Sequence, residues 1–399
     1  MDLESNGAHS GRSSRHQVAA WLRPSSYALG IVAGYLILPV AGWILLCLAV
    51  MRIASTTVTV SVSFLGFLPI ALAINWSKEI ESDWSWYSAQ FLQYPHFSLV
   101  DIFGRTFHPR ANDLEEPLYY ILSWTTAQVF GANLGALNAV IVIWIYGCLS
   151  FAVGLIGRYL QLSPSYALVL HFMMLSLGFV FTLSTHLVRQ QMALASVIVA
   201  VAFLLGRKGV FALIALAVGI GFHTSAVVVA LAIGVGVWVS TQRTWRLLVT
   251  AITSGLAAGF AFWLFIGRGY EGQSAGGVSP LWIILDVLVV VGLLALRTSV
   301  SLETRRILGG LPAVMLTMLF FALANLTEPT PALRFYLYLA PFSALGAFLI
   351  GRIVFGIIFP GILPAWLVAG SGVISVVLMQ LRVYESDFTY ALNFLDLLP

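Results

Sequence analysis

The chain has 399 residues, of which 60% are hydrophobic and 9% are charged, with a formal net charge of +4. This composition excludes an ordinary soluble protein, and Lys and Arg spread singly along the chain argue against a nucleic-acid partner. Apolar runs of roughly 17 to 25 residues recur from Tyr27 to Gln380, which is the length that a membrane-spanning α-helix needs. The expected fold class is therefore an all-α polytopic integral membrane protein.

The predicted domain organisation is a polar N-terminal tail (1–26), a single transmembrane domain (27–380) and a C-terminal tail (381–399). The N-terminal tail has no cleavage pattern of a signal peptide, so we expect it to be retained. Both cysteines lie inside apolar runs, where neither a disulfide nor a metal role is expected. About 12 transmembrane helices are predicted, near residues 27–51, 54–75, 134–157, 165–186, 190–206, 209–222, 224–240, 247–266, 281–297, 307–325, 335–352 and 354–380.

Seven of the sixteen carboxylates fall between Glu79 and Glu116, within a predicted loop at 76–133. A membrane protein has few places for charge, so this acidic loop is a candidate functional site. A crossing at 118–130 would place the loop in the cytoplasm, whereas an amphipathic helix lying on the membrane surface would place it outside. The hydroxyl and amide residues of this segment favour the surface helix and an outward-facing loop. The basic N-terminal tail argues for a cytoplasmic N-terminus, so the orientation of that end stays open.

Basic residues mark every second connection from residue 134 onward, and the positive-inside rule places those connections in the cytoplasm. They are Arg158, Arg207 with Lys208, Arg243 with Arg246, Arg297 with Arg305 and Arg306, and Arg352. The stretch from Lys208 to Arg243 would be about 50 Å long as one helix, too long for a single crossing. A split at 219–225 makes two short crossings, whose tip is expected to line a water-filled cavity on the outer side.

Two polar motifs on the predicted outer side are candidates for chemistry. Arg189 with Gln190 opens a span, and its guanidinium suits a bidentate grip on diphosphate, although an arginine that snorkels to the membrane surface is the simpler alternative. His223, followed by Ser225, occupies the tip between the two short crossings. It could carry a proton or hydrogen-bond a sugar, or it could be an ordinary buried histidine satisfied by a backbone carbonyl.

The acidic loop interleaves carboxylates with aromatic residues, as a carbohydrate site would. Aromatic rings stack on sugar rings, and carboxylates accept hydroxyl hydrogens or act as a general base. For most of these residues a solvated loop with an aromatic interface belt explains the pattern equally well, but Asp83 and Glu116 are favoured as functional. Further candidates on the outer side are Arg268 and Arg334, which could join Arg189 around two lipid-linked diphosphates. No zinc-ligand spacing, phosphate-binding glycine loop or nucleophile elbow occurs.

The order of these motifs resembles the EpsG-like branch of Wzy-type bacterial polysaccharide and O-antigen polymerases. The resemblance runs from about residue 80 to 340, and it departs from the usual pattern in Trp84, where tyrosine is common, and in a longer basic N-terminus. The five segments that carry it are Asp83-Trp84 with Tyr87, Glu116-Pro117-Leu118-Tyr119, Arg189-Gln190, Phe222-His223 with Ser225-Ala226, and Arg334 with Tyr336.

The resemblance implies a multi-pass enzyme of the bacterial inner membrane with a lipid-donor (GT-C-like) glycosyltransferase architecture. It would join undecaprenyl-diphosphate-linked oligosaccharides, donor to acceptor, at the outer face, without metal or another cofactor. A chain-length regulator is a possible partner besides membrane lipid. The expected roles are catalysis for Asp83, Glu116 and His223; diphosphate binding for Arg189, Gln190, Arg268 and Arg334; and sugar binding for Trp84, Tyr87, Tyr119, Ser225 and Tyr336.

A flippase or transporter of lipid-linked sugars is the alternative from a different class, because broken helices and buried charge suit transport as well. The absence of recognisable inverted repeats and the clustering of polar residues toward one face argue against it. An O-antigen ligase or a polysaccharide acyltransferase would share the outward-facing cavity. Only a polymerase would make a ladder of repeats.

Overall fold

The computed structural model describes residues 28–76, 82–104, 116–176, 188–265, 280–297, 302–325, 332, 335–359 and 363–380. All regular secondary structure within these ranges is helical, which confirms the predicted all-α class. Six of the described helices are long and apolar enough to cross a membrane, and seven shorter apolar helices accompany them. The chain is therefore built as a polytopic membrane protein, while a total of about 12 spans stays a prediction.

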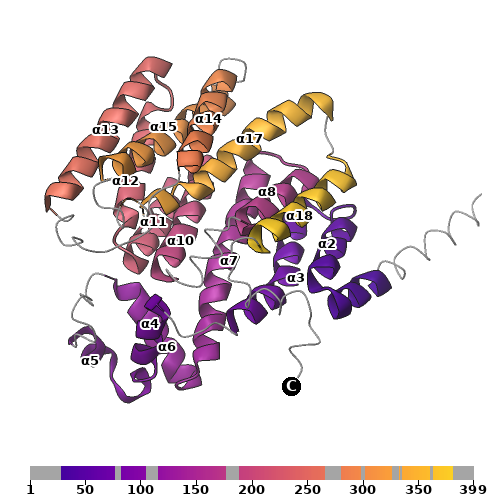
Figure 1. Cartoon of the computed structure of the whole chain (residues 1–399), viewed down its shortest axis with the longest axis vertical. Coiled ribbons are helices and arrows are strands. Elements are labelled where there is room, and N and C mark those ends of the chain that lie inside the picture. Colours follow the sequence, from indigo (N-terminus) through magenta and orange to yellow (C-terminus); the bar gives the residue numbers. More distant parts are fainter. Residues whose placement is uncertain are drawn as a thin grey trace, which may run out of the picture.

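One group of helices contains α2 (Pro39–Val50), α3 (Thr56–Trp76), α7 (Leu134–Tyr159), α8 (Pro164–Ser176) and α18 (Ala365–Gln380), which pack side by side (Figure 1). A fully buried histidine joins three of them. His171 of α8 lies with Nδ1 3.0 Å from Ser63 Oγ of α3 and with Nε2 2.8 Å from Ser150 Oγ of α7. Because both ring nitrogens have partners, this histidine meets the requirement that buried polar groups be hydrogen-bonded.

A second group contains the helices from residue 188 onward: α10 (Val188–Leu205), α11 (Gly209–Phe222), α12 (Ala226–Val239), α13 (Thr244–Phe265), α14 (Pro280–Leu296), α15 (Leu302–Ala324) and α17 (Ala340–Ile358). In this group α15 contacts α12, α13, α14 and α17, and α10 connects the two groups by packing against α7 and α11. A glycine lets α13 and α15 pack closely against each other, because a Cβ at Gly255 of α13 would lie 2.4 Å from the Thr317 carbonyl oxygen of α15.

We expect Gly255→Leu to destabilise the fold by about 1–3 kcal/mol or more, because the new side chain would collide with the backbone of α15. Gly234→Leu is the matched control, since a Cβ at that position of α12 meets nothing within 4 Å. Thermal unfolding of the purified proteins in detergent measures both effects. Equal stability of the two variants would show that the close contact between α13 and α15 is unimportant.

The acidic-loop region forms a separate cluster of short helices: α4 (Ser82–Phe91), η1 (Tyr94–His96), α5 (Leu99–Gly104) and α6 (Pro117–Phe130) (Figure 1). The predicted helix at 118–130 is present as α6. Its hydroxyl residues Ser123 and Thr126 are buried, and Gln128 Nε2 donates to the Tyr94 carbonyl at 3.1 Å. These polar groups therefore serve packing inside the cluster, and a position of α6 at the membrane surface stays a prediction.

Three predicted spans, 27–51, 335–352 and 354–380, have clearly different boundaries in the structure. The segment 27–51 is not one helix, because Leu38 has a non-helical backbone (φ −145°, ψ 89°) before Pro39 and separates the helix Ala28–Ile37 from α2. The predicted boundary near Arg352 between the spans 335–352 and 354–380 is also wrong, since α17 continues to Ile358 and α18 begins at Ala365. The predicted split at 219–225 is confirmed, because α11 ends at Phe222 and α12 begins at Ala226.

Candidate active site

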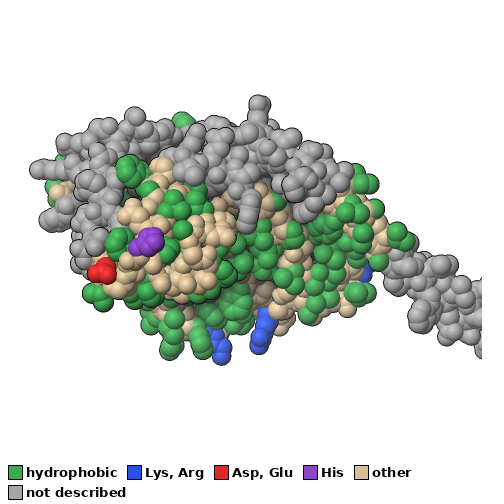
Figure 2. All heavy atoms as spheres, turned by 90° about the horizontal axis from the view of Figure 1, so that it is seen from below, with side chains coloured by type: hydrophobic (Ala, Val, Ile, Leu, Met, Phe, Trp, Pro, Cys, Tyr) green, Lys and Arg blue, Asp and Glu red, His purple; other side chains and the backbone are tan. Residues whose placement is uncertain are grey.

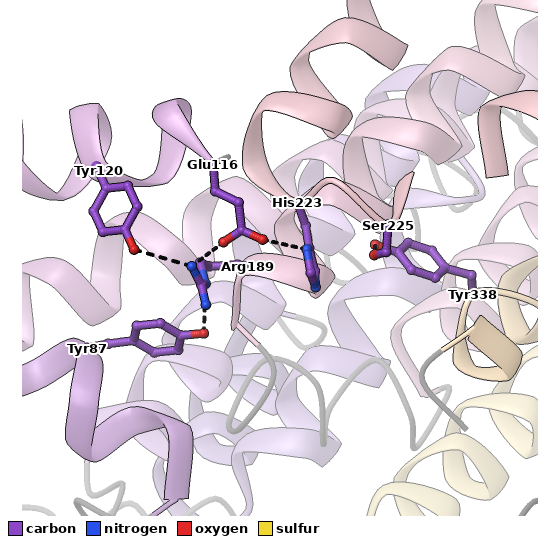
Figure 3. A network of polar contacts seen from close by, with 7 residues as sticks. All are labelled: Tyr87, Glu116, Tyr120, Arg189, His223, Ser225 and Tyr338. Carbon is purple, nitrogen blue, oxygen red and sulfur yellow. Dashed lines mark hydrogen bonds and ion pairs between the residues drawn. The ribbon is translucent and has the colours of Figure 1, made fainter. Parts of the chain in front are cut away.

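A carboxylate, a guanidinium and an imidazole meet where α6, α10 and the tip between α11 and α12 come together (Figure 3). Glu116 occupies the N-cap position of α6, but its side chain makes no capping hydrogen bond. One oxygen, Oε2, contacts Nη1 of Arg189, and the other, Oε1, lies 2.6 Å from Nδ1 of His223. Glu116 therefore bridges two segments of the chain that are more than 30 residues apart.

Arg189 is the second residue of α10, where a cation opposes the positive end of the helix dipole. The electrostatic cost of this position is offset by contacts with Glu116 and with aromatic residues of the acidic-loop cluster. Its Nε donates to Tyr87 Oη at 2.8 Å, and Nη1 makes a longer contact of 3.4 Å with Tyr120 Oη. The guanidinium carbon also lies 5.0 Å from the ring centroid of Tyr87 and 5.9 Å from that of Tyr119, within cation–π range. Burial raises the pKa of Tyr119, so this hydroxyl stays neutral and offers Arg189 a ring face.

A close contact between α11 and α6 holds His223 beside Glu116. A Cβ on Gly221 would lie 2.7 Å from the side chain of Leu118, so a larger residue there would force this leucine to move for α11 to approach the start of α6 this closely. His223 then leaves the helix with an extended backbone (φ −158°, ψ 122°), and its amide donates to the Gly219 carbonyl at 3.0 Å. The imidazole is thus placed by packing at the helix end.

The three charged or titratable side chains differ in exposure. The Glu116 side chain is 8% exposed, whereas Arg189 is 24% and His223 is 20% exposed. Within the part of the chain that the structure describes, neither Nη2 of Arg189 nor Nε2 of His223 has a hydrogen-bond partner. A ligand could therefore reach a guanidinium donor and an imidazole acceptor on either side of a shielded carboxylate.

Two further polar contacts involve the C-terminal helices. Ser225, next to the His223 tip, lies with Oγ 2.9 Å from Tyr338 Oη (Figure 3). Tyr336 donates instead to the buried carboxylate of Asp286 in α14, which also accepts from Ser343 of α17. Tyr336 is thus bound in a second polar cluster and makes no contact with the Arg189 group.

The structure brings together five of the predicted site residues: Tyr87, Glu116, Tyr119, Arg189 and His223. Gln190 and Trp84 are buried, at 2% and 1% exposure, so neither offers an open surface to a ligand in this structure. Asp83 belongs to α4, but its side chain lies outside the described residues, as do Arg268 and Arg334 entirely. The expected convergence of three arginines therefore stays a prediction.

Sequence reasoning missed Tyr120, Tyr338 and Asp286. Tyr120 directly follows a predicted site residue, but nothing in the spacing distinguished a hydroxyl that reaches Arg189. Asp286 did have a signal, since it is an isolated carboxylate inside an apolar run, where an ionisable residue is a functional hypothesis by default.

In a comparison with protein families, the model of the EpsG family matches residues 60–358 of the chain. This range includes the bridging carboxylate, the guanidinium and the imidazole. The comparison with curated proteins gave no match, and neither did the comparison with solved structures.

Proposed function

Because the chain belongs to the EpsG family, as its motifs predicted, we propose that it is a polysaccharide polymerase of the bacterial inner membrane. Its substrates would be oligosaccharide repeat units carried on undecaprenyl diphosphate, joined at the outer face by glycosyl transfer in a GT-C-like architecture. The observation that carries the proposal is the meeting of Arg189, Glu116 and His223 at one end of α10.

In the proposed reaction, the acceptor hydroxyl oxygen attacks the anomeric carbon of the donor sugar. The new C–O bond forms as the bond to the lipid diphosphate breaks, and the diphosphate leaves with the bonding electron pair. The acceptor proton moves to Nε2 of His223, which can accept it when Nδ1 carries the hydrogen that faces Glu116. Glu116 orients the ring and stabilises the imidazolium that forms, as the carboxylate of a catalytic triad does.

Arg189 would stabilise the negative charge that develops on the departing diphosphate. Its unused Nη2 donor and its partial exposure leave room for a phosphate oxygen. The backbone N–H groups at the start of α10 would add to the attraction, since helix N-termini favour anions. Tyr87 and Tyr120 hold the guanidinium in place, so little reorganisation is needed during the reaction.

The proposal is tested by incubating the purified protein in detergent with a defined undecaprenyl-diphosphate oligosaccharide and sizing the products. We expect a ladder of repeats together with released undecaprenyl diphosphate. With the protein reconstituted in vesicles, movement of the intact substrate across the membrane without any covalent change would show a flippase instead. Transfer of one unit to lipid A core would show a ligase, and acyl transfer would show an acyltransferase. Each of these results would overturn the assignment.

A further inference from the structure

A cavity of about 960 Å³ opens at the end of the helix bundle opposite the candidate active site. It lies between the last turns of α7, α10 and α12, the start of α15 and the face of α17. Its inner walls are apolar, with Leu204, Ile233, Val314 and Leu345 among the lining residues. Its volume is at the upper end of the roughly 300–1,000 Å³ found for small-molecule sites.

This cavity is distinct from the candidate active site. Arg189 lies at the start of the 18-residue α10, whereas Leu204 and Leu205 at its end line the cavity. A helix of that length spans about 27 Å, close to the thickness of the hydrocarbon core. If α10 crosses the bilayer, the cavity and Arg189 open to opposite leaflets.

The cavity has a basic rim. Arg207 and Arg306 are exposed and Arg352 is half-buried, and the lining residues that the structure describes include no carboxylate. All three arginines belong to the set of basic residues that the positive-inside rule places at the cytoplasmic side. Figure 2 shows protruding Lys and Arg side chains, in blue, at the lower edge of the view, with a further blue patch at the right; the acidic and histidine side chains, in red and purple, are at the left.

The backbone at the rim is also unusual. Gln161 (φ 50°) and Arg207 (φ 58°) are the non-glycine residues with positive φ in the described chain, and both line this cavity. They end α7 and α10 in a conformation that favours glycine at helix C-termini. A long polar side chain kept at a strained position is consistent with a binding role.

We infer that this cavity binds one anionic phospholipid from the leaflet on the basic side. Its acyl chains would lie between α12, α15 and α17, and its phosphate would meet Arg306 and Arg352 at the rim. An amphiphile is indicated because the walls are apolar while the mouth is cationic, and guanidinium groups pair well with phosphate. Basic pockets between transmembrane helices on the cytoplasmic side bind anionic headgroups for the same reason.

Native mass spectrometry of the full-length protein in detergent tests the charge requirement. Titration with phosphatidylglycerol is compared with titration with phosphatidylcholine of the same acyl chains. We expect one tightly bound phosphatidylglycerol, with affinity lost by roughly fivefold for each arginine removed, equivalent to about 1 kcal/mol. The double variant Arg306→Gln/Arg352→Gln should therefore bind about 25-fold more weakly. Arg246→Gln should bind normally, because Arg246 is exposed at the same end but does not line the cavity.

A second pair of variants tests the apolar part of the cavity. Gly356 lines it and Gly351 does not, yet both lie on α17 and a Cβ at either meets nothing within 4 Å. Gly356→Leu should reduce lipid retention, while Gly351→Leu should leave it unchanged. Equal binding of phosphatidylcholine, retention of polyprenyl phosphate in place of phospholipid, or unchanged binding in the double arginine variant would each overturn the inference.

Discussion

Arg189→Ala is expected to abolish polymer while single repeat units remain on their lipid carrier. Removing one preorganised donor to a developing negative charge typically costs about 10²–10³-fold in rate. The loss here should be at least that large, because Arg189 also holds Glu116, through which His223 is oriented. The measurement is product sizing with defined lipid-linked substrate, alongside polysaccharide analysis in cells. Normal polymer length would refute the role of Arg189.

A loss of activity in Arg189→Ala must be distinguished from a loss of folding. Breaking a buried ion pair by removing one partner can cost about 3–5 kcal/mol, and the Glu116 carboxylate is shielded. Arg189→Lys keeps a positive charge beside Glu116 but loses the planar fork, so it should fold like the native protein and still lose most activity. Arg246→Ala is the control for a cation removed from the opposite end, and it should polymerise normally.

Glu116→Gln is expected to lower polymerisation by about 10³-fold or more, because the amide keeps the shape of the side chain but cannot fix the imidazole as a carboxylate does. His223→Ala should cause a comparable loss. Since the two residues act as a unit, the double variant should be little worse than either single one. Additive losses in single-turnover rates would show that Glu116 and His223 act independently.

Asp101→Asn is the matched control for Glu116→Gln. Asp101 also belongs to the acidic loop, but it is exposed on α5, where its Oδ2 accepts from the amide and hydroxyl of Ser98 at 3.0 and 2.6 Å. Its replacement should leave polymer length unchanged. A loss as large as that of Glu116→Gln would mean that the overall charge of the loop is required and that the position of Glu116 is not special.

Much of this fold could be predicted from the sequence, because long apolar runs indicate membrane-spanning helices and the residues between the runs mark where many of these helices end. The same rules explain the errors. Arg352 was expected in a connection between spans, because a charged residue inside a membrane-spanning helix is costly. In the structure it lies within α17, where its side chain lines a cavity. Pro39 divides a continuous apolar run into two helices, and a prediction based on hydrophobicity alone does not detect this break.

The candidate site could be predicted residue by residue but not as an arrangement. Arg189, Glu116 and His223 were each identified from their chemistry, yet nothing in their spacing indicated that Glu116 would bridge the other two. That geometry depends on the tight contact between Gly221 and Leu118, which is a property of packing between α11 and α6. In the sequence, a tertiary contact of this kind is visible only as a glycine within an apolar run.

The ion pair between Glu116 and Arg189 has a consequence for substrate selection. Glu116 already neutralises the Arg189 guanidinium, so a small ambient anion would gain little by replacing the carboxylate. Under the proposed function, a lipid-linked diphosphate would bring more charge, together with the binding energy of its sugars and tail, to the Nη2 side of Arg189. Because Arg189 and His223 contact different oxygens of Glu116, the carboxylate would go on orienting the imidazole while such a donor binds.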